Sequence, residues 1–140
     1  MVAWKIFALG SALFAGMTAV LAKVGVKNVS SNLATFIRTV VILLFLCILL
    51  AIRREWQNPL LINKRSLLFL ALSAITTGLS WLCYYRALQD GPASLVAPID
   101  KLSVVFAVVL AILFLGERPG VHEWIGISLI IGGTCFIIFK

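Results

Sequence analysis

Five long apolar stretches without a charged residue constrain this chain more than any other feature of its sequence. They cover residues 6–22, 39–52, 66–85, 102–116 and 124–139. With flanking residues, each reaches the roughly 17–25 residues that a helix needs to cross a bilayer. The chain is 62% hydrophobic and 12% charged, with a mean hydropathy of +1.12, which lies outside the range of water-soluble domains. The sequence therefore predicts an integral membrane protein.

The five stretches favour helices over strands. Their apolar residues run continuously, whereas the strands of a membrane β-barrel alternate lipid-facing and lumen-facing residues. Short connections between consecutive helices favour antiparallel neighbours. We therefore predict an all-α membrane protein, a compact bundle of five transmembrane helices in a single domain over residues 1–140. The expected spans are about 4–24, 33–52, 66–88, 92–115 and 122–139.

The first stretch also has the lysine, apolar centre and small-residue end of a signal peptide, with Val20 and Ala22 placed for cleavage. We favour a spanning helix, because the segment continues into another span with no soluble domain to export. Cys47, Cys83 and Cys135 all lie within spans and lack the spacing of a metal site or a predictable disulfide. We expect no metal and no cofactor.

Lysine and arginine residues predict the orientation of a membrane protein, because cytoplasmic loops carry an excess of them. An odd number of spans places six basic residues on the side of the N-terminus: Lys5, Arg53, Arg54, Lys64, Arg65 and Arg118. The other side also has six: Lys23, Lys27, Arg38, Arg86, Lys101 and Lys140. Arg38 and Lys101 lie inside spans and count less, which leaves six against four and favours a cytoplasmic N-terminus. A bias this small also fits insertion in both orientations, and two opposed copies would form an inverted repeat.

Charged residues inside the predicted spans are the main candidates for function. Asp100 and Lys101 stand near the start of the apolar run "VAPIDKLSVVFAVVLAILFL", and with Lys23, Arg38 and Arg86 they share one end of the predicted bundle. Arg38 and the Asp100–Lys101 pair lie roughly 8–12 Å inside their helices at 1.5 Å per residue. Because helical neighbours point about 100° apart, we expect Asp100 and Lys101 not to neutralise each other well. We expect Asp100 to pair with Arg38.

Four basic groups against one acid would attract an anionic or zwitterionic substrate group. We therefore name Arg38 and Lys101 as candidate substrate-binding residues, and Asp100, Lys23 and Arg86 as coupling or structural charges. In the alternative, the long basic side chains reach to the headgroups. The side chain of Asp100 is too short for that, so proton coupling, if present, would run through it.

The third predicted helix carries a polar face. Ser73, Thr77, Ser80 and Tyr84 recur at spacings of four, three and four, with Trp81 and Tyr85 beside them. We predict that Thr77, Ser80 and Tyr84 contact substrate, and that Thr35, Thr39 and Ser103 could extend the lining. In the alternative, the hydroxyls bond to carbonyls of their own helix. In the fourth helix, Pro98 lacks an amide donor, which predicts a kink beside Asp100.

The segment "ALQDGPASLVAPIDKLSVVFAVVLAILFLGERPGVHEWIGISLIIGG", residues 87–133, resembles the C-terminal part of an EamA domain of the drug/metabolite transporter superfamily. The matching features are the Gly-Pro-Ala-Ser start of the fourth helix, Pro98, the "FLGE" ending at Glu117, and "E.IG..LI..GG". Many members have a proline before the "VF", where this chain has Ser103 and Val104. The resemblance implies an exporter or permease of the bacterial or archaeal inner membrane. Such chains commonly carry two five-helix units in opposite orientations, so a chain with one unit is expected to form a homodimer, with antiparallel subunits as one arrangement, or to pair with a different subunit.

Three functions remain open at this point. The first is a secondary transporter that moves a small metabolite or drug-like solute by alternating access in a dimer. The second is a flippase-like carrier for an anionic lipid phosphate, and the third is a non-transporting membrane subunit or small channel. We expect no enzyme, because the sequence has no His-Glu-x-x-His motif, no nucleophile-elbow glycine pattern and no paired carboxylates within the spans. The expected partners are the lipid bilayer and a small-molecule substrate, not a nucleic acid.

Overall fold

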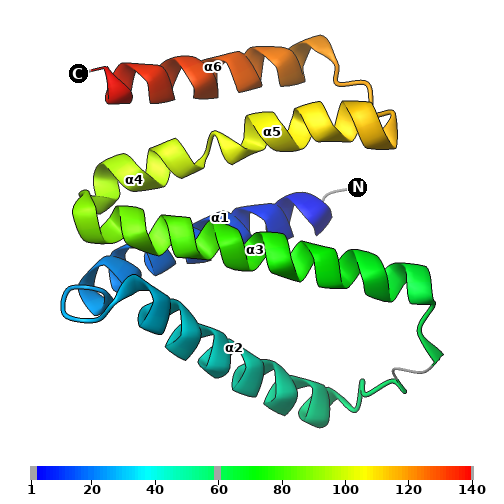
Figure 1. The fold of residues 1–140 in the computed structure, drawn as a ribbon. Helices are drawn as coiled ribbons and strands as arrows, with labels where there is room; N and C mark the ends of the chain where they lie inside the picture. Colours follow the sequence, from blue (N-terminus) through cyan, green and yellow to red (C-terminus); the bar gives the residue numbers. More distant parts are fainter. Residues whose placement is uncertain (1–2, 59–60, 140) are drawn as a thin grey trace. The chain divides into compact units, whose positions relative to one another are not determined.

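A computed structural model describes residues 3–58 and 61–139 of the chain. Helices make up 84% of it, and the described residues include no strand. In chain order they are α1 (Ala3–Gly25), α2 (Ser31–Arg53), α3 (Lys64–Asp90), α4 (Ala93–Asp100), α5 (Ser103–Leu110), the π-helical turn η2 (Ala111–Leu115) and α6 (Val121–Ile138), as Figure 1 shows. Lys140, which entered the charge count, lies outside the described residues.

Five segments of the described chain are long and apolar enough to cross a membrane: α1, α2, α3, the run Ala93–Leu115, and α6. The prediction of an all-α membrane protein with five spanning helices is therefore confirmed. Large apolar side chains are mostly exposed, as in Phe7 at 77% and Phe136 at 81%, which suits helices that face lipid. That the five helices form a single domain stays a prediction.

The first three helices extend one or two residues beyond the predicted bounds, whereas the fourth span begins one residue later, at Ala93, and α6 ends one residue earlier, at Ile138. α2 begins at Ser31, and the Ser30 hydroxyl accepts a hydrogen bond from the amide of Leu33 at 3.4 Å, which caps the helix. Arg54 ends α2 in the left-handed region, with φ of 54°. Gly116 ends η2 at φ of 68°, which explains the glycine of "FLGE", because glycine adopts this conformation without strain.

The predicted kink in the fourth span is confirmed and is a break in the helix. α4 ends at Asp100, and α5 begins only at Ser103. The amides of Lys101 and Leu102 bond the carbonyls three residues before them, Pro98 and Ile99, each at 3.0 Å, as in a 3₁₀-helix. Pro98, two residues before the end of α4, has no amide to donate to its own preceding turn, and a proline at this position destabilises the helix.

Backbone contacts divide the chain into two units, and each is described by itself. One unit holds residues 22–90, and within it α2 packs against the antiparallel helix α3. The other holds residues 1–21 and 91–140, and within it α6 packs against α4 and α5. Figure 1 shows each of these helix pairs side by side.

Candidate functional site

Two neighbouring helices of the first unit bring a cation against two aromatic rings. Arg38 stands on α2, seven residues after its first residue, Ser31, which places it about 10 Å along the helix. Trp81 and Tyr85 stand four residues apart on α3, so they share one helical face. The contact between α2 and α3 brings these three side chains together.

The guanidinium of Arg38 lies over both rings. Its central carbon is 4.2 Å from the centroid of the Trp81 ring and 5.6 Å from that of Tyr85, within the range of a cation–π interaction. Nη1 also donates a hydrogen bond of 3.3 Å to the Tyr85 hydroxyl, and Tyr85 is only 5% exposed. We call Arg38, Trp81 and Tyr85 the arginine–aromatic cluster.

The arginine–aromatic cluster leaves most donors of the guanidinium open. Arginine has five N–H groups, and among the described residues Arg38 makes the single hydrogen bond to Tyr85 and no ion pair. Arg38 is half-buried, and its planar fork matches a carboxylate or phosphate. Chemically, the cluster is an anchored cation with free donors inside a span.

The polar residues around this cluster bond mainly to their own helices. Thr77 donates to the Ser73 carbonyl at 2.8 Å, and Thr35 and Thr39 donate to carbonyls one turn back, also at 2.8 Å. These bonds match the alternative in which threonine hydroxyls serve their own helix. The other two predicted contact residues are Ser80, which is exposed, and Tyr84, whose ring stands edge-on to that of Tyr85 with centroids 6.4 Å apart.

Asp100 and Lys101 lie in the other unit, at the break between α4 and α5. The Lys101 ammonium is 3.8 Å from the Asp100 carboxylate, so these neighbours do form an ion pair, because the four-carbon side chain of lysine can fold back toward its neighbour. Both side chains keep solvent access, 56% for Lys101 and 37% for Asp100, so the ion pair is a weak one. The pair expected between Asp100 and Arg38 stays a prediction.

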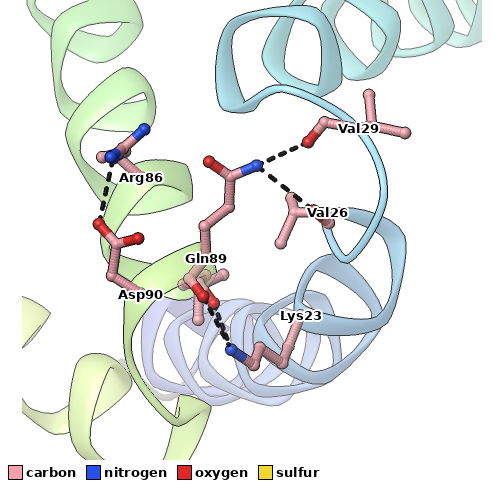
Figure 2. A network of polar contacts seen from close by, with 7 residues as sticks. Lys23, Val26, Val29, Arg86, Gln89 and Asp90 are labelled. Carbon is pink, nitrogen blue, oxygen red and sulfur yellow. Dashed lines mark hydrogen bonds and ion pairs between the residues drawn. The ribbon is translucent and has the colours of Figure 1, made fainter.

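Lys23 holds the C-terminal end of α3. Its ammonium donates to the carbonyl of Leu88 and, at 3.5 Å, to that of Gln89, as Figure 2 shows. The last carbonyls of a helix lack partners within the helix and carry partial negative charge. Of the two roles predicted for Lys23, coupling or structural, this geometry supplies a structural one.

Gln89 makes a second contact between the same two regions, this time with the donor on α3. The sequence did not lead us to expect this residue. Its side-chain amide donates to the carbonyls of Val26 at 3.3 Å and Val29 at 2.6 Å, both in the turn between α1 and α2 (Figure 2). The available signal was a glutamine at the end of a predicted span, beside a short turn whose backbone carbonyls lie outside any helix. We call the two-way contact of Lys23 and Gln89 the helix-end clasp.

Arg86 forms an ion pair with Asp90 one helical turn later, with Nε 3.1 Å from Oδ2 (Figure 2). Both side chains are about two-thirds exposed, and exposed pairs of this spacing contribute about 0.3–0.5 kcal/mol. The pair depends on α3 reaching Asp90 rather than ending at Leu88 as predicted. Asp90, the last residue of its span, is thus an acid within a candidate span, like Asp100 and Glu123.

The sequence features and the five helices agree with a known family. Residues 2–139 match the sequence model of the EamA-like transporter family. The chain belongs to the EamA-like transporter family. The resemblance seen in residues 87–133 is thereby confirmed, and it extends over nearly the whole chain.

Relatives of this EamA-like chain include proteins named as transporters. An uncharacterized transporter in the cobO 3′ region of Sinorhizobium sp is 48% identical over 134 residues, which cover 96% of this chain and 95% of that protein. A probable 4-amino-4-deoxy-L-arabinose-phosphoundecaprenol flippase subunit of Yersinia pseudotuberculosis is 32% identical over 79 residues, which cover 56% of this chain and 69% of that protein. No solved structure shows a significant match.

Proposed function

We propose that this protein is a secondary transporter, an exporter or permease of a small anionic or zwitterionic solute. The observation that carries the proposal is the arginine–aromatic cluster, in which a guanidinium within a span is anchored on Trp81 and Tyr85 and keeps open donors. A charge in this position costs several kcal/mol unless it meets a partner or water. A substrate carboxylate or phosphate is the partner that fits the free donors best.

Transport in this proposal follows alternating access in a dimer of the bacterial or archaeal inner membrane, with a cytoplasmic N-terminus. The substrate meets Arg38 and Lys101, with Thr77, Ser80 and Tyr84 along its path, and proton coupling runs through Asp100. The break at Asp100 supports this role, because non-helical backbone at membrane depth is tolerated only inside protein or beside a water-filled cavity.

The test is uptake into proteoliposomes of purified protein, with a panel of labelled amino acids and sugar phosphates under an imposed pH gradient. We expect at least one anionic or zwitterionic member to accumulate, and no neutral sugar. Arg38→Lys removes the planar fork but keeps the charge. The variant should lose one charge-assisted hydrogen bond to the substrate, which is worth about 1.5–3 kcal/mol. We therefore expect uptake at subsaturating substrate concentration to fall about 10-fold or more. Asp100→Asn should abolish only the part driven by the pH gradient.

Arg65→Lys is the matched control for Arg38→Lys. Arg65 also lies over an aromatic ring, 5.9 Å from the centroid of Phe69, but in the exposed first turn of α3. It should leave uptake unchanged. The proposal fails if no panel member accumulates, or if Arg38→Lys and Arg65→Lys transport equally well. Retained gradient-driven uptake by Asp100→Asn would remove the coupling role from that residue alone.

A flippase-like carrier of an anionic lipid phosphate is the second candidate, supported by the relatives named as flippase subunits for a phosphoundecaprenol-linked sugar. Arg38 would then bind the lipid phosphate rather than a soluble anion. The measurement that separates the two is movement of a fluorescent polyprenyl phosphate between leaflets of the same proteoliposomes. If neither the lipid nor any soluble solute moves, the third reading, a non-transporting subunit, gains support.

A further inference from the structure

A half-open groove of about 600 Å³ lies at the helix-end clasp, separate from the arginine–aromatic cluster. Its apolar lining includes Val24, which is 72% exposed, above the buried side chains of Val26 and Leu88. Its polar lining consists of Lys23, Lys27 and Gln89. The volume falls in the range of sites for small ligands.

Basic side chains outnumber acidic ones in the lining of this groove. Lys23 is used to hold the carbonyls at the end of α3. Lys27 stands one turn further along, is exposed, and its ammonium makes no hydrogen bond or ion pair with the described residues. The acid near this end of α3, Asp90, is paired with Arg86. The groove therefore keeps a net positive charge beside an apolar lining.

The groove lies where three helix ends meet: α1 ends at Gly25, α2 begins at Ser31, and α3 ends at Asp90. All three are candidate membrane spans, so these ends reach the headgroup layer of one leaflet. A ligand at this depth meets cationic groups on one side and apolar side chains on the other. A phosphate joined to an apolar body has this distribution of polarity.

We infer that the groove binds the phosphate of an anionic phospholipid, with Lys27 as the direct contact and Lys23 behind it. The lipid backbone and the first part of its acyl chains lie against Val24. Free phosphate shares the recognised chemistry but lacks the apolar part. The inference does not depend on which solute the protein transports, because the groove and the arginine–aromatic cluster use different residues.

The test is native mass spectrometry of the full chain in detergent, titrated with phosphatidylglycerol, with phosphatidylcholine, or with inorganic phosphate. Removing one interfacial lysine contact weakens binding about 5-fold, so Lys27→Gln should lose phosphatidylglycerol affinity by about that factor. Lys27→Arg should retain it. Lys64→Gln is the matched control, because Lys64 is an exposed lysine in the first turn of the same helix α3, at the opposite end from the groove.

Lys27→Gln should keep the helical content of the unchanged protein, since the Lys27 ammonium holds no other group in the described structure. Lys23→Gln is less suitable, because it removes a bond of the helix-end clasp. Binding of inorganic phosphate that Lys27→Gln weakens and that displaces phosphatidylglycerol would support a phosphate site and assign it to a soluble anion. Equal affinity for phosphatidylglycerol and phosphatidylcholine, or equal losses in Lys27→Gln and Lys64→Gln, would overturn the inference.

Discussion

At the scale of single residues, Gln89 ties the turn between α1 and α2 to the end of α3 through one amide group. Gln89→Leu keeps the size of the side chain but removes the side-chain donor from the carbonyls of Val26 and Val29. The Val26 carbonyl keeps a bond of 3.5 Å from the backbone amide of Val29, so the loss falls mainly on the bond to the Val29 carbonyl. A hydrogen bond of this kind contributes about 0.5–1.5 kcal/mol. We expect Gln89→Leu to lower the free energy of unfolding by that amount, measured by denaturant titration in detergent and followed by circular dichroism.

Gln57→Leu is the control for this change, because Gln57 is an exposed glutamine in the loop after α2. It should leave the unfolding free energy within about 0.5 kcal/mol of the original. Equal destabilisation by both variants would mean that the amide bonds of Gln89 hold nothing together. Gln89→Glu gives a further check, since a carboxylate facing two carbonyl oxygens should cost at least as much as leucine.

At the scale of elements, the break between α4 and α5 makes a prediction about water. Pro98 cannot donate to the carbonyl of Ser94, so that carbonyl needs another partner. If the break lines a transport path, a cysteine at Ser103 in a background without the native cysteines should react with a water-soluble maleimide. We expect it to react at least 10-fold faster than a cysteine at Leu110, which lies two turns further along on the same face of α5.

The two cysteine variants are compared in intact proteoliposomes and again after denaturation, so that intrinsic reactivity is measured separately. Leu110 is half exposed in the isolated chain and shares a face with Ser103, so slower reaction at Leu110 would confine water to the break itself. Similar protection of both cysteines would place the break in lipid or in packed protein and remove it from the transport path. Faster reaction at Leu110 would contradict the proposed path more directly.

The elements also show what the sequence can and cannot foretell. Charge-free length predicted all five spans, because crossing a membrane is set by a stretch of apolar residues rather than by distant contacts. The exact ends were missed at Asp90, since a charged residue at the headgroup layer does not stop a helix. Gln89 and the stacking of Arg38 on Trp81 were missed because they depend on which helices pack together, and hydropathy carries no information about that.

At the scale of the whole molecule, the open question is how many orientations the chain adopts. Six basic residues on the N-terminal side against four on the other is a small excess. Reporters active only in the cytoplasm or only outside it, each fused after Lys140, measure the two orientations separately. For a single orientation with a cytoplasmic N-terminus, five spans place the C-terminus outside, so only the outer reporter should be active.

The same fusions test whether the charge excess sets the orientation. Arg53→Gln together with Arg54→Gln reduces the N-terminal count from six to four and makes the two sides equal. We expect this double variant to raise the cytoplasmic signal by at least twofold, whereas Arg38→Gln, inside a span, should change the signal less. Activity of both reporters in the unchanged chain would make an antiparallel homodimer the working arrangement, since each subunit could then meet an inverted copy. An outer signal that the double variant leaves unchanged would mean that every subunit points one way, and an inverted site would then require a different partner chain.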